Sequence, residues 1–454
     1  MLERENFRSR LGFILVSAGC AIGIGNVWKF PWLVGENGGG FFVLLYLLFL
    51  EIMGIPVMAM ELAVGRSSRK SGARGFMALE RKGEKWHWIG YMAIVGCYIL
   101  MMFYTSVCGW MLSYFWKFLT GAFSSSATQS EVSAAFSSML SSPLESVIFM
   151  VISVLIGIGV CSLGLKNGVE RITKVMMTGL LALIVVLAIH SFSLPGAMEG
   201  LEFYLLPSLD RIRDKGMMSV VVAAMNQAFF TLSLGICAME IFGTYMSKEN
   251  TLVSESLRSA LLDTFVAIVS GLIIFPSCFS YSIAPDSGPS LIFITLPNVF
   301  INMKGGRVWG TLFFAFMSFA SLSTVIAVFE NIVASFMDNY GWERKKSVGV
   351  NFVLFLLLSL PCALENNILK GTTLLGGKGI LDSLDFLVSN IILPLGSILI
   401  VLFSVYSRSW GLKGAMEEIN TGRGIKIKNT KALKIYLGVV LPLLILTVGI
   451  LALL

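Results

Sequence analysis

Long apolar segments most limit how this chain can fold. A transmembrane helix needs about 20 apolar residues, and we find eleven segments of roughly that length or more. They lie at 11–34, 40–65, 88–118, 144–163, 171–192, 217–245, 255–281, 308–338, 347–363, 381–408 and 433–453. Inside a bilayer every backbone polar group needs a partner within the protein, and helices of this length provide it. We therefore predict an all-α polytopic membrane protein with eleven transmembrane helices.

Charge is scarce and unevenly distributed. Only 13% of the 454 residues are charged, whereas soluble domains carry about 25%. Of the 34 Lys and Arg residues, 25 lie at the N-terminus and in alternate loops, and nine lie elsewhere. The positive-inside rule then predicts a cell-membrane protein with a cytoplasmic N-terminus and, because eleven is odd, an extracellular C-terminus. Basic loops also explain the net charge of +7, so we expect no nucleic-acid partner.

The chain offers little for catalysis. Its seven cysteines are scattered singly, so we expect neither a disulfide nor a thiolate metal site. No group of His, Cys or paired carboxylates converges as a catalytic centre requires. The pattern does not favour a membrane-embedded enzyme.

Two of the eleven segments are interrupted, at 19–31 and 229–240. The first reads G-C-A-I-G-I-G-N-V-W-K-F-P and the second F-F-T-L-S-L-G-I-C-A-M-E. They are spans one and six, so they match if the chain contains two five-helix halves of opposite topology. We predict halves at 1–192 and 193–410, with a linker and eleventh helix at 411–454. Close packing through small residues is the alternative reading of the glycines.

Polar residues inside or at the ends of spans are candidate functional groups. Asp263 is costly in a membrane, which favours a pathway or a partner, although it could also lie near the interface. Ser323 and Thr324 are mid-span hydroxyls, which often bond only to their own helix. Two opposite-charge pairs could close gates or be independent charges: Lys29 with Asp385 outside, and Arg4 with Asp338 inside.

Ordered motifs within residues 4–410 carry a family resemblance. R-L-G-F-I-L at 10–15 and G-I-G-N-V-W-K-F-P at 23–31 resemble the first helix of the neurotransmitter:sodium symporters. Further similar motifs are E-N-G-G-G at 36–40, G-I-P at 54–56, E-L-A-V-G-R at 61–66, Q-A-F-F-T-L-S-L-G at 227–235 and G-P-S-L-I-F-I-T-L-P at 288–297. The chain looks like the bacterial amino-acid transporter branch, which implies a 5+5 inverted repeat with broken helices one and six.

The resemblance implies two sodium sites built from hard oxygen ligands. The first would use the Ala21 carbonyl, the side chains of Asn26, Thr231 and Asp263, and the substrate carboxylate. The second would use the carbonyls of Gly19, Ile22 and Ala320 and the hydroxyls of Ser323 and Thr324.

The resemblance also implies a substrate site between the two breaks. The substrate carboxylate would meet amides around Gly25 and the Tyr104 hydroxyl, and the amine would meet carbonyls near Ala21, Phe230 and Thr231. The pocket would be lined by Leu100, Phe230, Ser233, Ile236, Ser323 and Val328. Tyr104 and Phe230 would form a lid beneath the Lys29–Asp385 gate.

Three departures from the family pattern refine this expectation. Gly23 stands where monoamine members carry Asp, which favours a substrate that brings its own carboxylate. Asp263 and Ala267 replace the Asn and Ser of chloride-dependent members, so the protein should not need chloride. Lys29 replaces an Arg that is common at the gate, and lysine cannot form a bidentate pair.

The functional expectation is a sodium-coupled importer of a neutral, hydrophobic L-amino acid. Two sodium ions, a small amino acid and the bilayer are its expected partners. A sodium-dependent sensor or a channel-like protein on the same scaffold is the alternative that the residues leave open.

Overall fold

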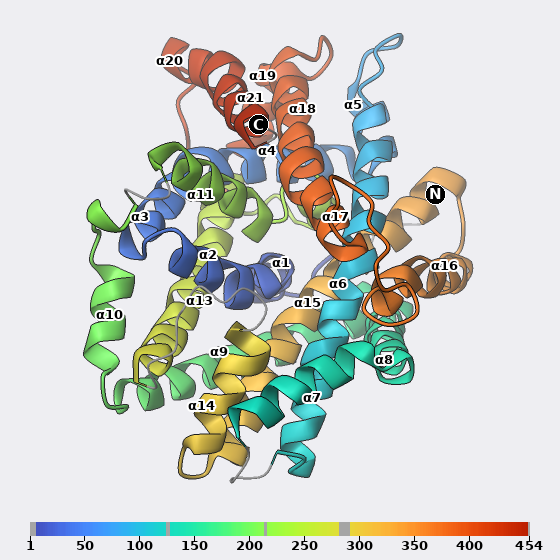
Figure 1. Ribbon diagram of the computed structural model, residues 1–454. Helices are drawn as coiled ribbons and strands as arrows, with labels where there is room; N and C mark the ends of the chain where they lie inside the picture. The colour runs from blue at the N-terminus through green and yellow to red at the C-terminus, as the bar shows by residue number, and fades with distance from the viewer. Residues whose placement is uncertain (1–5, 124–127, 213–215, 281–290, 453–454) are drawn as a thin grey trace.

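The computed structural model describes residues 6–123, 128–212, 216–280 and 291–452 of the chain, and they form a helical bundle (Figure 1). The α-helices are α1 (Arg10–Ala21), α2 (Phe30–Glu36), α3 (Gly40–Phe49), α4 (Ile55–Ser68), α5 (Ala73–Leu79), α6 (Trp88–Thr120), α7 (Gln129–Ser141), α8 (Pro143–Ser162), α9 (Glu170–Phe192), α10 (Ala197–Leu205), α11 (Met217–Thr231), α12 (Ala238–Thr244), α13 (Leu252–Ser280), α14 (Leu296–Asn302), α15 (Gly306–Tyr340), α16 (Arg344–Leu364), α17 (Ile380–Leu387), α18 (Leu393–Tyr406), α19 (Gly411–Ile419), α20 (Lys431–Ile435) and α21 (Leu441–Leu451). Short turns of wider or tighter helix continue or join them: η1 (Gly25–Lys29), η2 (Leu50–Gly54), η3 (Leu165–Val169), η4 (Asp210–Ile212), η5 (Leu291–Thr295), η6 (Val388–Ile392) and η7 (Tyr436–Val440).

The expectation of an all-helical polytopic membrane protein is confirmed. In the described part of the chain, nine helical stretches are long and apolar enough to cross a bilayer. They are Gly40–Ser68, Trp88–Thr120, Pro143–Ser162, Leu165–Phe192, Leu252–Ser280, Gly306–Tyr340, Arg344–Leu364, Ile380–Tyr406 and Lys431–Leu451. A tenth span is possible if α1 and the following helix are counted as one bent span.

The remaining difference from eleven expected spans lies at 217–245. This segment contains α11 and α12, each too short on its own to cross a bilayer. Elsewhere the expected boundaries agree with the helices to within a few residues. The fifth span is longer than expected, because the helix already begins at Leu165. Residues 165–170, which the expected spans leave in a loop, are helical. Expected span ends at 281 and 453 lie outside the described residues.

The first broken span bends by 54° between α1 and the helix that starts at Gly25. The Ser9 side chain accepts a hydrogen bond from the Gly12 amide and caps the start of α1. The helix ends where Ile22 adopts an extended conformation, with φ −71° and ψ 97°. The last carbonyls of α1 and the first amides of the next helix are therefore released inside the protein, where other groups can use them.

The second broken span contains an unusual turn at 232–237. Ser233, Gly235 and Cys237 have φ values of +51°, +87° and +56°. For the two residues other than glycine, this conformation costs about 1–2 kcal/mol each. Such strain persists only where the surrounding structure imposes it, and it is concentrated at functional sites.

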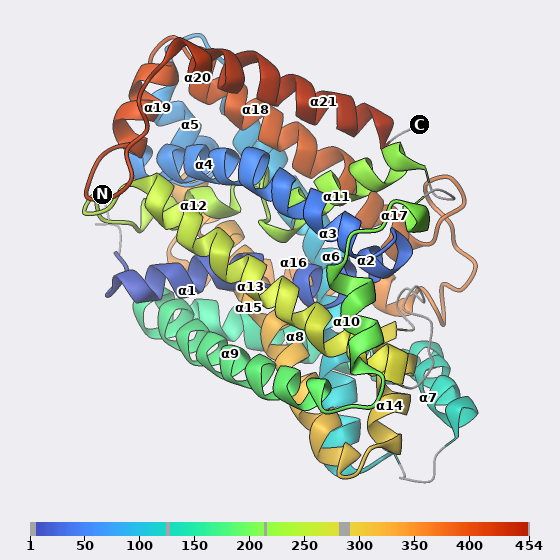
Figure 2. The same ribbon diagram turned by 90° about the vertical axis from the view of Figure 1, so that its left-hand side faces the viewer.

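Tight packing fixes the position of α12 against α4. A Cβ atom at Gly65 would lie 1.8 Å from the Glu240 carbonyl oxygen, and one at Gly243 would lie 2.3 Å from that of Leu62. Only glycine permits the two backbones to approach so closely. The long helix α15 runs through the interior, and 83% of the residues in its most apolar 18-residue stretch are buried. It packs against α1, α6, α8 and α9, while α21 lies at an edge of the bundle beside α18 (Figure 2).

Candidate functional site

The two helix breaks meet in the interior of the bundle. The Ser233 hydroxyl donates to the Cys20 carbonyl at 3.3 Å, and the Gln227 amide donates to the Gly25 carbonyl at 2.8 Å. The Phe230 ring packs against Gly25, where a Cβ would come within 3.0 Å of it. Released backbone groups from both spans therefore share one buried region.

Asp263 of α13 lies beside this region and is completely buried. Its carboxylate accepts a hydrogen bond from the Asn26 amide at 2.8 Å, and others from the Thr231 hydroxyl at 3.2 and 3.3 Å. The Tyr46 hydroxyl donates to it at 3.4 Å. Two of the other residues expected around the first sodium, Asn26 and Thr231, are thus within hydrogen-bond distance of Asp263.

The donor set around Asp263 suits a hard cation. Among the described residues, the hydrogen-bond partners of this carboxylate are all neutral. A carboxylate buried among neutral partners is either protonated or balanced by a cation. Carboxylate, amide and hydroxyl oxygens are the ligands that hard cations prefer. The residues present therefore fit a sodium ion.

A second group of oxygens surrounds the end of α1. The Thr324 hydroxyl lies 3.5, 3.2 and 3.5 Å from the carbonyl oxygens of Gly19, Cys20 and Ile22. The Ser323 hydroxyl lies 3.3 Å from the Ile22 carbonyl and 2.9 Å from that of Ala320. All five residues expected at the second sodium site therefore converge. The hydroxyls reach across to α1 and do not bond only to their own helix.

A small cavity lies where the two breaks meet. Its lining residues come from both breaks and from α6, α15 and α18: Cys20, Ala21, Gly23, Gly25, Leu100, Tyr104, Phe230, Ser233, Ile236, Thr324 and Leu393. The Tyr104 hydroxyl also accepts a hydrogen bond from the Ile24 amide at 2.9 Å. Thr231, Ser323 and Val328, which we had expected in the pocket, are buried but lie outside this lining.

Gly23 leaves no room for a side chain at the cavity wall. A Cβ there would lie 2.3 Å from the Tyr104 hydroxyl oxygen and 2.4 Å from that of Thr324. Real Cβ atoms essentially never come closer than 3.0 Å to another heavy atom. The glycine therefore keeps two hydroxyls at the cavity that a larger residue would displace.

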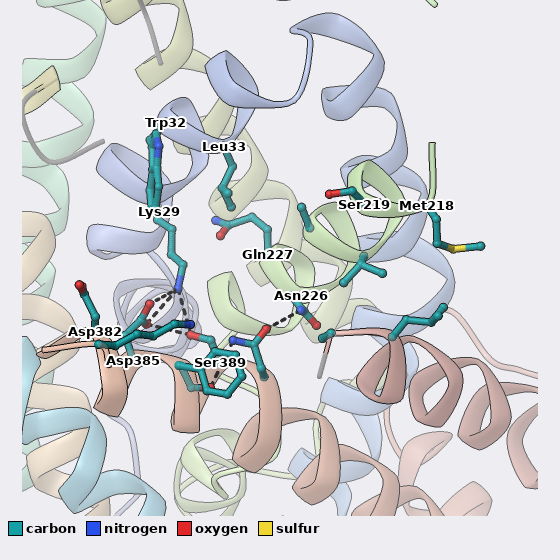
Figure 3. Close-up of a pocket in the computed structure, with 17 residues that line it drawn as sticks. Lys29, Trp32, Leu33, Met218, Ser219, Asn226, Gln227, Asp382, Asp385 and Ser389 are labelled. Carbon is teal, nitrogen blue, oxygen red and sulfur yellow. Dashed lines mark hydrogen bonds and ion pairs between the residues drawn. The ribbon is translucent and has the colours of Figure 1, made fainter. Parts of the chain in front are cut away.

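Lys29 and Asp385 form an ion pair (Figure 3). The Lys29 ammonium lies 2.9 Å from both carboxylate oxygens and 3.0 Å from the Ser389 hydroxyl. It also lies 4.1 Å from the centre of the Phe230 ring. Tyr104 and Phe230 line both the small cavity and a larger one of about 470 Å³ above it. These two rings therefore lie between the two spaces, and the ion pair lines the larger one.

The expected inner pair is only partly described. Arg4 lies outside the described residues. The Asp338 carboxylate accepts hydrogen bonds from the Ser71 amide at 2.7 Å and from the Ser71 hydroxyl at 2.6 Å. It therefore connects the end of α15 to the start of α5.

Several residues of the site were not expected from the sequence. Tyr46 contacts Asp263, Ser389 contacts Lys29, and Leu393 lines the cavity. The Asn331 amide of α15 donates to the Ile236 carbonyl at 3.1 Å and so connects α15 to the second break. Each lies on an apolar helix whose pattern does not show which side faces the site. For Tyr46 and Asn331, a polar group in a long apolar span was the available signal.

The fold is that of a polytopic helical membrane protein, with two groups of buried oxygens and a small cavity in its interior. The model of the sodium:neurotransmitter symporter family matches residues 4–135 and 135–454. The chain belongs to this family and is a sodium-dependent transporter.

Individual relatives agree with this assignment. The chain is 33% identical to an uncharacterized sodium-dependent transporter, YhdH, of Bacillus subtilis (strain 168), over 87% of this chain and 86% of that protein. It is 28% identical to the sodium- and chloride-dependent GABA transporter 2 of Bos taurus, over 78% of this chain and 67% of that protein. The crystal structure of MhsT in complex with L-phenylalanine superimposes with a TM-score of 0.89. It has 34% sequence identity and covers 99% of this chain and 100% of MhsT.

Proposed function

We propose that this protein imports neutral, hydrophobic L-amino acids by alternating access, coupled to two sodium ions and without chloride. The buried Asp263 carboxylate carries the proposal. It lies between the two breaks with neutral hydroxyl and amide partners, so its charged form requires a cation such as sodium to balance it.

The proposed architecture has eleven spans in two inverted halves. Residues 1–192 and 193–410 form the halves, with α11 and α12 together as the sixth span, and 411–454 add a linker and the last span. The positions of the two breaks at the start of each half support this division. Because the basic loops belong inside, the N-terminus is cytoplasmic and the C-terminus extracellular.

Coupling follows from a shared ligand. The substrate carboxylate completes the first sodium site with Ala21, Asn26, Thr231 and Asp263, so each of the two ligands raises the affinity for the other. The second sodium, at Gly19, Ile22, Ala320, Ser323 and Thr324, joins the end of α1 to α15. An ion that moves inward across 100 mV gains about 2.3 kcal/mol, which can drive accumulation of the amino acid.

Substrate selection rests on the wall of the small cavity. The Tyr104 hydroxyl accepts from the Ile24 amide and can donate its own proton to a substrate carboxylate. Leu100, Phe230, Ile236 and Leu393 supply apolar surface for a side chain. MhsT in complex with L-phenylalanine has the same fold, which supports a hydrophobic amino acid for this chain also.

Alternating access needs one closed gate on each side. Lys29 and Asp385, with Phe230 and Tyr104 below, form the outer gate, and the ion pair supports this role. Arg4 and Asp338 form the inner gate.

Uptake of labelled amino acids into proteoliposomes tests the proposal. Uptake of leucine, methionine, phenylalanine, tyrosine and tryptophan is measured. The measurement is repeated with sodium replaced by choline and, separately, with chloride replaced by gluconate. We expect concentrative uptake of one or more hydrophobic members that stops without sodium and continues without chloride. Uptake that continues without sodium would refute the proposal.

The chloride part has its own variant, Asp263→Asn. Removal of the carboxylate removes the negative charge beside the first sodium, so we expect uptake either to become chloride-dependent or to stop. Asp382→Asn is the matched control, since it removes an exposed carboxylate outside the sodium sites. If Asp263→Asn retains full, chloride-independent uptake, the charge argument is wrong.

A further inference from the structure

A basic cavity lies at one end of the bundle, away from the transport site. Seven of its eight lining residues share a charged or aromatic character, and the eighth is a glycine: Arg81, Lys82, Gly83, Glu84, Lys85, Trp86, Tyr406 and Arg408. Its volume is about 700 Å³. Two segments far apart in sequence form it: the turn between α5 and α6, and the end of α18 with the residues that follow it.

Glu84 joins these two segments. Its carboxylate accepts hydrogen bonds from the Arg81 amide at 2.9 Å, from the Arg408 amide at 3.1 Å and from the Ser407 hydroxyl at 3.4 Å. The hydrogen bond from the Arg81 amide, with that from Arg408, lowers the pKa of this carboxyl below its usual value. The carboxylate is thus engaged by backbone and hydroxyl donors of the cavity wall.

Four cationic side chains remain around the cavity: those of Arg81, Lys82, Lys85 and Arg408. Among the residues that the structure describes, none of them takes part in an ion pair. All four are exposed. The cavity therefore has four positive charges and one negative charge, which suits an anion with several acceptor oxygens.

The cavity also lies at the boundary of the membrane. Trp88 begins the span Trp88–Thr120, and Tyr406 ends the span Ile380–Tyr406, so the lining is just beyond the apolar part of both. Trp88 is 62% exposed and Tyr406 53% exposed. Exposed Trp and Tyr at span ends lie at the level of lipid headgroups. In Figure 1 the turn after α5 reaches the same end of the molecule as α19 and α20.

We propose that this cavity binds the phosphate group of an anionic phospholipid. Arginine and lysine recognise phosphate oxygens, and basic pockets beside spans bind anionic headgroups. A free phosphate ion shares this chemistry, but the rim of exposed aromatic rings favours the lipid. The site does not depend on the proposed transport activity.

The test uses the full-length protein in detergent, titrated with phosphatidylglycerol or phosphatidylcholine and followed by native mass spectrometry. The variant neutralises the four cations: Arg81→Gln, Lys82→Gln, Lys85→Gln and Arg408→Gln. The control removes the same charge from exposed lysines outside the cavity: Lys345→Gln, Lys426→Gln, Lys428→Gln and Lys431→Gln.

We expect the parent protein to prefer phosphatidylglycerol, the cavity variant to bind it at least about tenfold more weakly, and the control to keep most of its affinity. Equal losses in the two variants, or no loss in either, would overturn the proposal. A parallel titration with inorganic phosphate separates the sources. If the cavity variant loses phosphate binding but keeps phosphatidylglycerol binding, the lipid assignment is wrong.

Stability of the variant is checked by its elution as a monodisperse species. If the fourfold variant does not fold, the double variant Arg81→Gln with Lys82→Gln replaces it. Its control is Lys426→Gln with Lys428→Gln, and the same comparison decides the outcome.

Discussion

At the scale of single residues, Gly23 is the position where the smallest change has the largest expected effect. In Gly23→Ala the new methyl group would press on the hydroxyls of Tyr104 and Thr324, which the proposed substrate and sodium sites use. We expect sodium-dependent uptake to fall by at least about tenfold, the loss that follows from misplacing groups by a fraction of an ångström. Initial rates of uptake measure this.

A matched substitution in another transmembrane helix controls for the loss of glycine. A methyl group added at Gly159 of α8 would have no heavy atom within 4 Å, and alanine is the better helix former by up to about 1 kcal/mol. Gly159→Ala should therefore transport normally. Equal uptake by the two variants would show that the space at Gly23 is not needed.

Thr324 gives a second residue-scale prediction. Thr324→Val keeps the shape of the side chain and removes the hydroxyl that faces three carbonyl oxygens of α1. We expect the sodium concentration for half-maximal uptake to rise about tenfold, because one ligand of a charged group contributes about 1.5 kcal/mol.

The control for Thr324→Val is Ser318→Ala on the same helix. The Ser318 hydroxyl is buried and has no hydrogen-bond partner in the described residues, so its removal should leave the sodium dependence unchanged. The second sodium site would be wrong if Thr324→Val shifted the sodium dependence no more than Ser318→Ala.

The sequence predicted some residues of the candidate site and missed others. Asn26, Thr231 and Asp263 were expected together and lie together. Tyr46 and Leu393 were missed, since a helix that is apolar on all sides does not reveal which residue faces the site. The resemblance, and not the hydropathy pattern, supplied most of the expected ligands.

At the scale of elements, the contact between η1 and α17 depends on Lys29 and Asp385. The two side chains are 17% and 31% exposed, and partly exposed ion pairs contribute up to about 1 kcal/mol. Asp385→Asn should therefore speed substrate release from the sodium-bound protein by up to about fivefold. A chase of bound labelled amino acid with unlabelled substrate measures the rate.

Asp382→Asn is the control for the gate. Asp382 lies on the same helix and, like Asp385, lines the cavity of about 470 Å³, but it is exposed. Release that accelerates equally in both variants would mean that the Lys29–Asp385 pair does not retain the substrate.

A second element-scale contact holds α19 against α4. The Arg66 guanidinium is fully buried and donates to the Glu418 carboxylate at 2.6 Å and to the Asn250 carbonyl at 2.7 Å. Glu418→Gln would leave this buried cation without its counter-charge, a change that destabilises a protein by about 3 kcal/mol. The melting temperature in detergent should fall clearly, whereas Glu417→Gln, at an exposed neighbour, should not change it. Equal melting temperatures would show that the pair does not stabilise this junction.

At the scale of the whole molecule, hydropathy predicted the bundle well. The apolar spans and both interruptions were visible as long apolar runs and as glycines beside polar residues. The short helices α5, α7, α10 and α19 were not predicted. Each has 13 residues or fewer and lies in a connecting segment, so no apolar run reveals it. The contacts that bring the two breaks together are long-range, and no local pattern encodes them.

Concentrative uptake tests most directly whether the protein is a sodium-coupled importer. A channel or sensor on the same scaffold could bind sodium and an amino acid without accumulating the amino acid. Proteoliposomes receive labelled L-phenylalanine, or the best substrate of the panel, with an inward sodium gradient as the only energy source. We expect an internal concentration that exceeds the external one and collapses when the sodium gradient is dissipated. Equilibration without accumulation, with the gradient intact, would contradict it.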